Sequence, residues 1–194
     1  DEHGRFITQL QTFGLLIHYM LEVRGERGPI VRAVTSTRMA DRLGERYGCP
    51  VYETPVGFKH LGEKMTQVDA LIAGEESGGF GFRGHIPERD GVLSGLLLLD
   101  YLTKTKKRPS ELLADLFELV GPHEYDRVDV TLRPDERDEI RRRVAAADPD
   151  SIAGLSVETR DSVDGFRFTM EGGWWLLLRF SATEPLLRIY AEMP

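Results

Sequence analysis

The sequence has one cysteine, no long apolar run and no surplus of basic residues, and each absence excludes a class of protein. The single thiol, Cys49, cannot form an internal disulfide, so we expect a reducing, cytoplasmic setting. The longest apolar run, residues 96–99, is far shorter than the ~20 residues of a membrane helix, so no membrane partner is predicted. The net charge of −7 argues against nucleic acid as the main partner, because phosphate-backbone binding requires a basic face.

Two further signals are absent. The chain opens with Asp1 instead of Met and has no basic and apolar signal segment, so we expect a piece of a longer or processed protein. His3, His18 and His123 have no second ligand at the spacing of a metal site. The sequence therefore predicts no metal bound by this chain.

Local patterns divide the chain into two parts of different class. Residues 1–121 alternate strand-like and helical segments, which favours an α/β layer domain with a mixed sheet. Residues 122–194 carry one helical segment, starting at Pro134, among short alternating strands. The second part is therefore predicted to be a small α+β domain with a mostly antiparallel sheet and a flanking helix.

Strands are expected over residues 4–9, 29–37, 50–57, 68–74, 125–132, 154–161, 165–171, 174–180 and 186–192. Helices are expected over residues 8–24, 37–48, 58–67, 91–105 and 111–120. Asp90 and Ser110 are the expected N-caps of the last two helices.

Residues 73–91, AGEESGGFGFRGHIPERDG, follow a predicted strand, and α/β sheets bind ligands beyond the carboxyl ends of their strands. Glu75 and Ser77 would project to one side of an extended segment, where a carboxylate beside a hydroxyl suits vicinal sugar hydroxyls. Four glycines would let the backbone approach a ligand: Gly74, Gly78, Gly79 and Gly81. The alternative is a solvated surface loop with Glu75 and Glu76 exposed.

A second candidate group is the ammonium of Lys59, which lies at a strand-to-helix turn. It can orient a phosphate or act as an acid/base group, although a plain surface charge is the alternative.

In RFSATEPLLR, residues 179–188, Arg179 offers a planar fork for a phosphate, and Ser181 and Thr183 add hydroxyl donors. Pro185 is expected to interrupt strand pairing and leave backbone N–H groups free for an anion nest. An edge-strand turn is the alternative interpretation of this segment.

Three segments, in this order and spacing, resemble the α-D-phosphohexomutase superfamily: YETPVGFKHLGEKM, GEESGGFGFRGHIPERDG and RFSATEPLLRIYAE. GEES is most similar to the phosphoglucomutase branch. The family has four domains, and this chain resembles the third (residues 1–121, with the sugar-recognition loop) and the fourth (residues 122–194, with the phosphate-binding loop). The phosphoserine loop of the first domain and the Mg²⁺-binding loop of the second have no counterpart here.

The resemblance implies an isomerase, an intramolecular phosphotransferase that interconverts hexose 1-phosphate and hexose 6-phosphate through a bisphosphate. This chain would be its sugar- and phosphate-binding half and would be inactive alone. Its implied partners are the hexose phosphate and domains one and two of the same protein, which would also hold the Mg²⁺.

The resemblance also implies roles for individual residues. Glu75 and Ser77 would hold the sugar hydroxyls, and Lys59 would lie near the reacting end as the catalytic group. His85 and Arg89 would support the loop or the reacting phosphate. A third set would bind the phosphate that is not reacting: Arg179, Ser181, Thr183 and Arg188.

Some positions depart from the family pattern. Gly79 stands where many members have His, so no acid/base role is carried to it. Phe180 and Ala182 replace the Pro and Gly of RPSGTEP, which predicts a stiffer or shifted loop, and the end at Pro194 predicts a shortened fourth domain. Glucose and mannose substrates both remain open, as do a non-catalytic sugar-phosphate-binding module and an amino-sugar phosphomutase.

Overall fold

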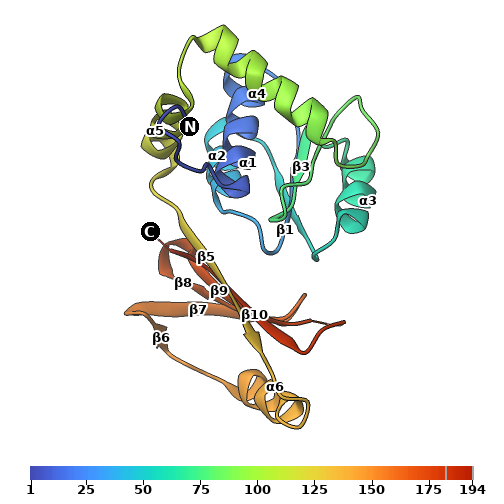
Figure 1. Cartoon of the computed structure of the whole chain (residues 1–194), viewed down its shortest axis with the longest axis vertical. Helices are drawn as coiled ribbons and strands as arrows, with labels where there is room; N and C mark the ends of the chain where they lie inside the picture. The colour runs from blue at the N-terminus through green and yellow to red at the C-terminus, as the bar shows by residue number, and fades with distance from the viewer. Residues whose placement is uncertain (182, 194) are drawn as a thin grey trace. The chain divides into compact units, whose positions relative to one another are not determined.

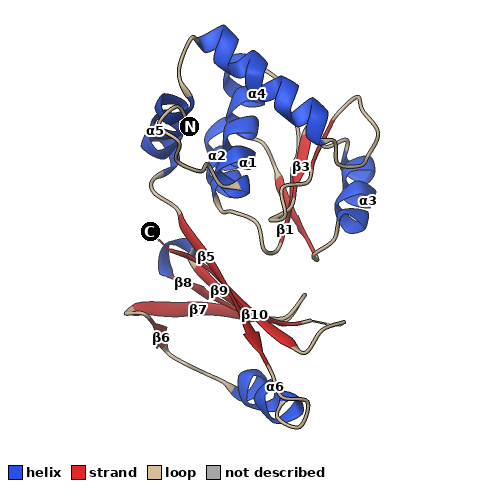
Figure 2. Ribbon diagram, viewed as in Figure 1, coloured by secondary structure: helices blue, strands red, loops and turns tan. Residues whose placement is uncertain are grey.

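The computed structural model describes residues 1–181 and 183–193, so Ala182 and Pro194 lie outside the described residues. The chain forms two compact units, Asp1–Pro122 and His123–Pro194, which divide beside the expected boundary at Gly121 and Pro122. Figures 1 and 2 show helices around a sheet in the first unit and a sheet flanked by a helix in the second.

The first unit is built on a mixed sheet in the order β2-β1-β3-β4. β1 (Ile30–Ala33), β2 (Val51–Thr54) and β3 (Ile72–Gly74) are parallel, and β4 (Phe80–Phe82) is antiparallel to β3. Because the three parallel strands share a carboxyl edge, the segments that follow β2 and β3 leave the sheet on the same side.

Helices cover both faces of this sheet (Figure 2). A larger apolar cluster joins one face to four helices: α1 (Gln9–His18), α2 (Met39–Tyr47), α4 (Gly91–Thr105) and α5 (Pro109–Val120). A smaller cluster joins the other face to α3 (Phe58–Val68). α1 contacts α2, α4 and α5, which explains why the consecutive residues Leu15, Leu16 and Ile17 are all buried. It continues as a π-helical turn, Tyr19–Val23.

The N-caps predicted for two helices can be compared with the observed starts of α4 and α5. Asp90 caps α4 as predicted, because its Oδ1 accepts the Leu93 N–H at 2.9 Å. The cap predicted at Ser110 is wrong: α5 begins at Pro109, with Arg108 at its N-cap. Pro109 is pre-organised for the first helical position, where its missing N–H costs no hydrogen bond, so the helix begins before Ser110.

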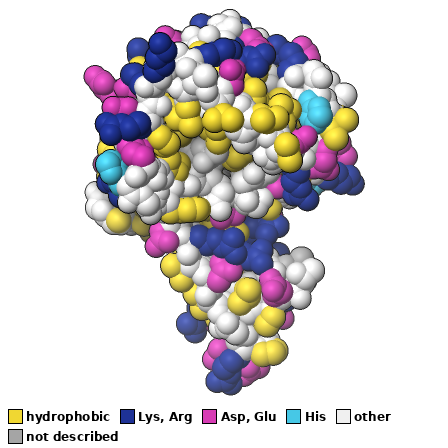
Figure 3. Space-filling model, turned by 45° about the horizontal axis from the view of Figure 1, so that its top comes forward, with side chains coloured by type: hydrophobic (Ala, Val, Ile, Leu, Met, Phe, Trp, Pro, Cys, Tyr) yellow, Lys and Arg dark blue, Asp and Glu magenta, His cyan; other side chains and the backbone are white. Residues whose placement is uncertain are grey.

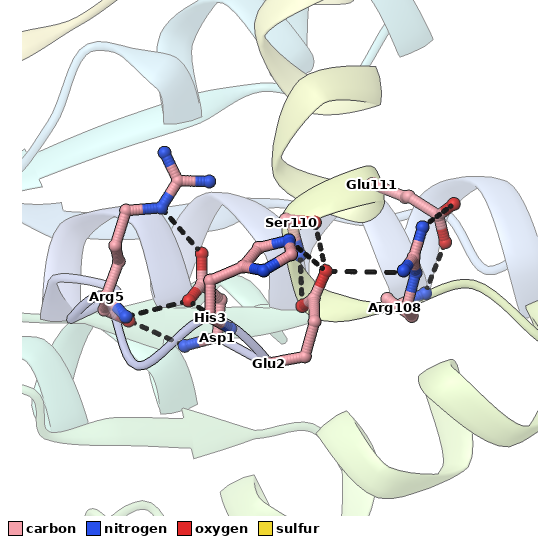
Figure 4. Close-up of polar contacts among 7 residues, drawn as sticks. All are labelled: Asp1, Glu2, His3, Arg5, Arg108, Ser110 and Glu111. Carbon is pink, nitrogen blue, oxygen red and sulfur yellow. Dashed lines mark hydrogen bonds and ion pairs between the residues drawn. The ribbon is translucent and has the colours of Figure 1, made fainter.

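The strand predicted over residues 4–9 is also wrong, because the segment is irregular up to Thr8 and α1 begins at Gln9. Its backbone donors bond to nearby groups instead of to a sheet: Asp1 Oδ1 accepts the N–H of Arg5 at 2.8 Å (Figure 4), and Gln11 Oε1 accepts the N–H of Thr8 at 2.9 Å. Glu2 accepts hydrogen bonds from the hydroxyl and N–H of Ser110, fastening the segment to α5. The Ser110 hydroxyl lowers the pKa of Glu2 to about 2.

The second unit is a sheet in the order β5-β10-β9-β8-β7-β6 in which every neighbouring pair is antiparallel. The strands are β5 (Glu124–Thr131), β6 (Ser151–Ile152), β7 (Leu155–Asp161), β8 (Phe166–Met170), β9 (Trp175–Phe180) and β10 (Leu186–Met193). α6 (Arg137–Ala146) flanks the sheet, with the Arg141 guanidinium 6.0 Å from the centre of the Phe180 ring. The predicted combination of an α/β unit and an antiparallel α+β unit is confirmed.

Two details of the second unit differ from expectation. α6 begins at Arg137 instead of Pro134, because residues 134–136 form a turn, and the short strand β6 was not predicted. Trp175 belongs to the sheet core: it is buried, and its Nε1 donates to the buried carboxylate of Glu192 at 3.0 Å.

The surface combines charges of both signs with some apolar side chains. In Figure 3, Lys and Arg side chains lie among Asp and Glu side chains over both units. Val92, Leu96 and Leu99 of α4 are more than half exposed. Within the part of the chain that the structure describes, no helix is long and apolar enough to cross a membrane.

Candidate functional site

The glycine-rich segment folds as a hairpin between β3 and β4. Gly78 donates its N–H to the Glu75 carbonyl at 3.1 Å, and Glu75 donates its N–H to the Gly79 carbonyl at the same distance. Gly78 has φ +93°, a conformation that a residue with a Cβ rarely adopts. The extended geometry considered for Glu75 and Ser77 is therefore wrong: Glu75 is buried, whereas Ser77 is exposed at the turn.

β4 was not predicted, although the sequence held a signal for it. Phe80, Gly81 and Phe82 alternate in size after a glycine-containing turn, as in a hairpin strand. Phe80 stacks on Phe13 of α1 with ring centres 5.5 Å apart, which fixes the second arm of the hairpin to the core.

Two of the four glycines face the protein core instead of a ligand. A Cβ at Gly74 would lie 2.5 Å from the Phe13 ring, and one at Gly81 would lie 3.0 Å from the ring of Phe58. These positions allow α1 and α3 to pack closely against the hairpin. The expectation that they let a ligand approach is wrong for both.

Glu75 follows β3 directly, at the carboxyl edge of the sheet, and its carboxylate is paired with a cation. Arg89 Nη1 lies 2.8 Å from Glu75 Oε1, and the exposed fraction is 7% for the Glu75 side chain and 57% for that of Arg89. Burying a carboxylate is costly unless it is paired, so Arg89 compensates the charge of Glu75. The alternative of a solvated Glu75 is therefore wrong.

Lys59 lies at the same edge, in the first turn of α3 after β2, and its side chain is exposed. Within residues 1–181 and 183–193 it makes no hydrogen bond or ion pair, so its ammonium group can meet a ligand. The neighbouring Phe58 ring lies 5.9 Å from the Arg89 guanidinium. Arg89 therefore connects the segment that carries Lys59 to the one that carries Glu75.

His85 contacts the start of α4. Its Nε2 lies 2.9 Å from Asp90 Oδ2, while the other oxygen of Asp90 caps the helix. The Leu93 N–H and then His85 lower the pKa of Asp90. His85 thus contacts the end of the segment, near Arg89, and does not contact Glu75.

This edge of the first unit offers one buried acceptor, one exposed ammonium group and one exposed hydroxyl. A carboxylate can accept hydrogen bonds from sugar hydroxyls, the Ser77 hydroxyl can donate or accept, and the Lys59 ammonium can neutralise a phosphate. Such a set suits a phosphorylated polyol better than an apolar ligand.

The second predicted loop, between β9 and β10, is held by its own backbone. Ser181 donates its N–H to the Leu186 carbonyl at 2.9 Å, and its Oγ accepts the Glu184 N–H at 3.2 Å. The Ser181 carbonyl accepts from Arg137 Nη2 at 2.6 Å. The anion nest expected around Pro185 is wrong for these groups, because the N–H groups of Ser181, Glu184 and Leu186 are all bonded.

The side chains of this loop are the other groups that were predicted to bind a phosphate. Thr183 is exposed, whereas Ser181 is only 2% exposed. Arg179 Nε lies 2.8 Å from Asp164 Oδ1, and Arg188 Nη2 lies 2.7 Å from Glu184 Oε2. The sequence interpretation missed both pairings, because Asp164 lies 15 positions from Arg179 and the four-residue spacing of Glu184 and Arg188 indicates a pair only in a helix.

No metal site is built from these groups. Within the two described ranges, no group of three or more His, Cys, Asp and Glu side chains is arranged to hold a metal ion. His18 instead bonds to the Tyr101 hydroxyl at 2.8 Å inside the core, and His123 packs against Trp174 with ring centres 5.1 Å apart.

Comparison with known families gives two matches. Residues 9–120 match phosphoglucomutase/phosphomannomutase, alpha/beta/alpha domain III, and residues 139–194 match the C-terminal domain of the same family. A phosphoglucomutase/phosphomannomutase of Thermococcus kodakarensis is 31% identical over 99% of this chain. A phosphoglucosamine mutase of Rubrobacter xylanophilus is 34% identical over 99% of it. The chain spans 40% of the length of each of these relatives.

Solved structures agree with the fold. A Thermus thermophilus protein assigned as a phosphomannomutase is 37% identical, with a TM-score of 0.78, over 96% of this chain and 37% of its own. The open form of parafusin, a phosphoglucomutase from Paramecium, shares the fold at 23% identity and a TM-score of 0.80, over 97% of this chain and 37% of its own.

Proposed function

The chain belongs to the phosphoglucomutase/phosphomannomutase family, and from this premise we propose that it is the sugar- and phosphate-binding part of a hexose-phosphate mutase. Its units would be the third and fourth domains of a longer protein, since relatives extend well beyond the part that this chain matches. The observation that carries the proposal is the buried, charge-paired carboxylate of Glu75 at the carboxyl edge that also holds Lys59.

In this proposal each loop recognises one part of the substrate. Glu75 accepts hydrogen bonds from sugar hydroxyls, with Ser77 beside it, and Lys59 stabilises charge at the reacting phosphate. The phosphate that is not reacting is bound in the second unit by Arg179, Arg188, Ser181 and Thr183. A mutase must bind its bisphosphate in two orientations, which suits contacts to hydroxyl and phosphate groups that both orientations present.

Mg²⁺ would be held elsewhere in the longer protein. The described residues of this chain offer no cluster of metal ligands, so no step is assigned to the metal here. The phosphoserine and metal loops of the family would likewise come from the preceding domains. We therefore expect the isolated chain to bind substrate without turning it over.

Two measurements test this proposal. Titration of the labelled chain with glucose 1-phosphate should shift NMR signals in residues 75–79 and near Lys59. Incubation with glucose 1-phosphate, Mg²⁺ and glucose 1,6-bisphosphate should give no glucose 6-phosphate. The absence of binding would remove the substrate role, and steady turnover would show that the missing domains are not required.

An amino-sugar substrate is the second candidate, because the Rubrobacter relative at 34% identity is a phosphoglucosamine mutase. Glucosamine 1-phosphate carries an ammonium group in place of a hydroxyl, which a buried carboxylate can also bind. The same titration with both sugar phosphates separates the two: a clearly lower Kd for glucosamine 1-phosphate would favour the amino-sugar mutase. A non-catalytic sugar-phosphate-binding module would show binding in this chain, with no serine or Asp-rich loop in any longer protein that contains it.

A further inference from the structure

We propose that Arg89 is a positioning residue, which holds the Glu75 carboxylate in the orientation that receives the sugar. The inference rests on the function proposed above and assigns to Arg89 one role: acting through Glu75, and not by binding the phosphate. It also gives Gly79 a role, as the position that leaves room for this pair.

The ion pair between Glu75 and Arg89 holds the Glu75 carboxylate in place as a hydrogen-bond acceptor. Glu75 Oε1 lies 2.8 Å from Arg89 Nη1, and no other cation contacts the carboxylate within residues 1–181 and 183–193. Glu75 Oε2 makes no hydrogen bond within these ranges, and it is not among their fully buried polar atoms without a partner. One oxygen is therefore used to fix the carboxylate, and the other is left for a donor that arrives with the ligand.

Gly79 is the neighbour that makes this arrangement fit. A Cβ at this position would lie 2.7 Å from Glu75 Oε1 and 3.0 Å from Arg89 Cδ. A contact of 2.7 Å is closer than real Cβ atoms come to another heavy atom, so a side chain here would displace the carboxylate or the arginine. The space beside residue 79 is occupied by the ion pair itself.

Arg89 is fixed in turn by its surroundings. Its guanidinium lies 5.9 Å from the centre of the Phe58 ring, the first residue of α3, in a cation–π arrangement. Arg89 also directly precedes Asp90, the cap of α4. The side chain thus spans from the start of α4 to the start of α3, so the position of Glu75 is coupled to the helix turn that carries Lys59.

The competing role for Arg89 is a direct contact to a ligand phosphate. Its Nη1 is already bonded to Glu75, so a phosphate that took this group would leave a buried carboxylate without its partner. That loss is unfavourable for the buried acid. The geometry therefore favours positioning over phosphate binding.

The test compares the affinities of the 194-residue chain for glucose 1-phosphate and for inorganic phosphate, both measured by NMR titration. Arg89→Gln should weaken glucose 1-phosphate binding about tenfold, the effect of one charged hydrogen bond, and leave inorganic phosphate unchanged. Arg89→Lys should restore most of the loss. Gly79→Ala should reproduce it without removing any charge.

A double-mutant cycle with Glu75→Gln shows whether Arg89 acts through Glu75. If it does, Arg89→Gln should weaken binding little further once Glu75 is Gln. Arg24→Gln is the matched control, because Arg24 is also paired with a glutamate, Glu26, but precedes β1 at the opposite edge of the sheet. Thermal melts of all variants exclude unfolding as the cause, and the ¹³C signal of the Glu75 carboxylate reports whether it becomes mobile in Arg89→Gln.

Two results overturn the proposal: an unchanged affinity for glucose 1-phosphate in Arg89→Gln, or an equal loss for inorganic phosphate, which would make Arg89 a phosphate ligand. If the parent chain does not bind glucose 1-phosphate at all, the proposed function fails, and the role of Arg89 fails with it. The parent titration thus separates the two failures.

Discussion

Arg179 and Arg188 lie directly opposite each other on β9 and β10; Asp164 pairs with Arg179, and Glu184, with Asp129 at 3.6 Å, pairs with Arg188. Opposite residues of an antiparallel pair point to the same face, and like charges there are destabilising. Asp164 and Glu184 offset that repulsion. A phosphate could replace these carboxylates, because it offers the same charge-assisted hydrogen bonds to both guanidinium groups.

We predict that the chain binds inorganic phosphate or sulfate weakly at Arg179 and Arg188. The Kd should be roughly 1 mM, which corresponds to a binding free energy of ~4 kcal/mol. Added salt should weaken binding, because the site is near the surface. In an NMR titration the shifts should concentrate at Arg179, Ser181 and Thr183 and be lost in Arg179→Ala. Asp164→Asn should tighten binding by removing the competing carboxylate. Shifts spread evenly over residues 141–143 would indicate nonspecific anion binding instead.

In the longer mutase that would contain this chain, Glu75→Gln should lower kcat/KM. The loss should correspond to ~1.5–3 kcal/mol of transition-state stabilisation, as expected for a lost charged hydrogen bond. The change also leaves Arg89 facing a neutral amide. Steady-state assays with glucose and mannose phosphates measure this effect. An unchanged kcat/KM for both substrates would contradict the sugar-binding role.

Arg32 should be important for the stability of the first unit. Its side chain is 3% exposed, and Nε and Nη1 lie 2.6 Å from Asp41 and 2.7 Å from Glu53. Arg32→Met should lower the free energy of unfolding by about 3 kcal/mol, because it removes the buried cation that binds both Asp41 and Glu53. Urea titrations measure the change. Arg24→Met, which breaks a more exposed pair, should cost less than about 1 kcal/mol. Equal stability of Arg32→Met and the parent would show that apolar packing replaces the ion pair fully.

The attachment of the N-terminal segment to α5 should depend on pH. Because the folded chain lowers the pKa of Glu2 from 4.5 to about 2, the ionised carboxylate stabilises the attachment above about pH 4.5. That contribution is lost progressively as the pH falls toward about 2. Hydrogen exchange of the Ser110 amide, corrected for its intrinsic pH dependence, should lose protection over this range. In Glu2→Gln the protection should be lower throughout and no longer change across the window.

Local signals in the sequence predicted most elements because each signal acts within a few residues. Asp90 satisfies a helix N–H three positions later, and Gly48 adopts the left-handed conformation that ends α2, with φ +66°. The strand β4 was missed because the alternation of its three residues is a short local pattern, and the strand is stabilised mainly by pairing with β3 and by Phe13.

The candidate site was only partly predictable. Its residues were identified by the resemblance of three motifs to a known family. The parallel order of the strands places Lys59 and Glu75 at the same carboxyl edge of the first sheet. The pairing of Glu75 with Arg89 had no local signal, nor did the inward-facing positions of Gly74 and Gly81. These features depend on how closely α1 and α3 pack against the hairpin.

By itself, therefore, the sequence determined the fold class, the helix ends set by local hydrogen bonds, and the residue types available for a sugar phosphate. Only the tertiary structure decided which charges meet. Arg89 reaches Glu75 across 14 positions and Arg179 reaches Asp164 across 15, each after the chain has turned back on itself. The physical reason is that an ion pair requires atoms within a few ångströms, and chain reversal and packing set that distance, whereas sequence spacing does not.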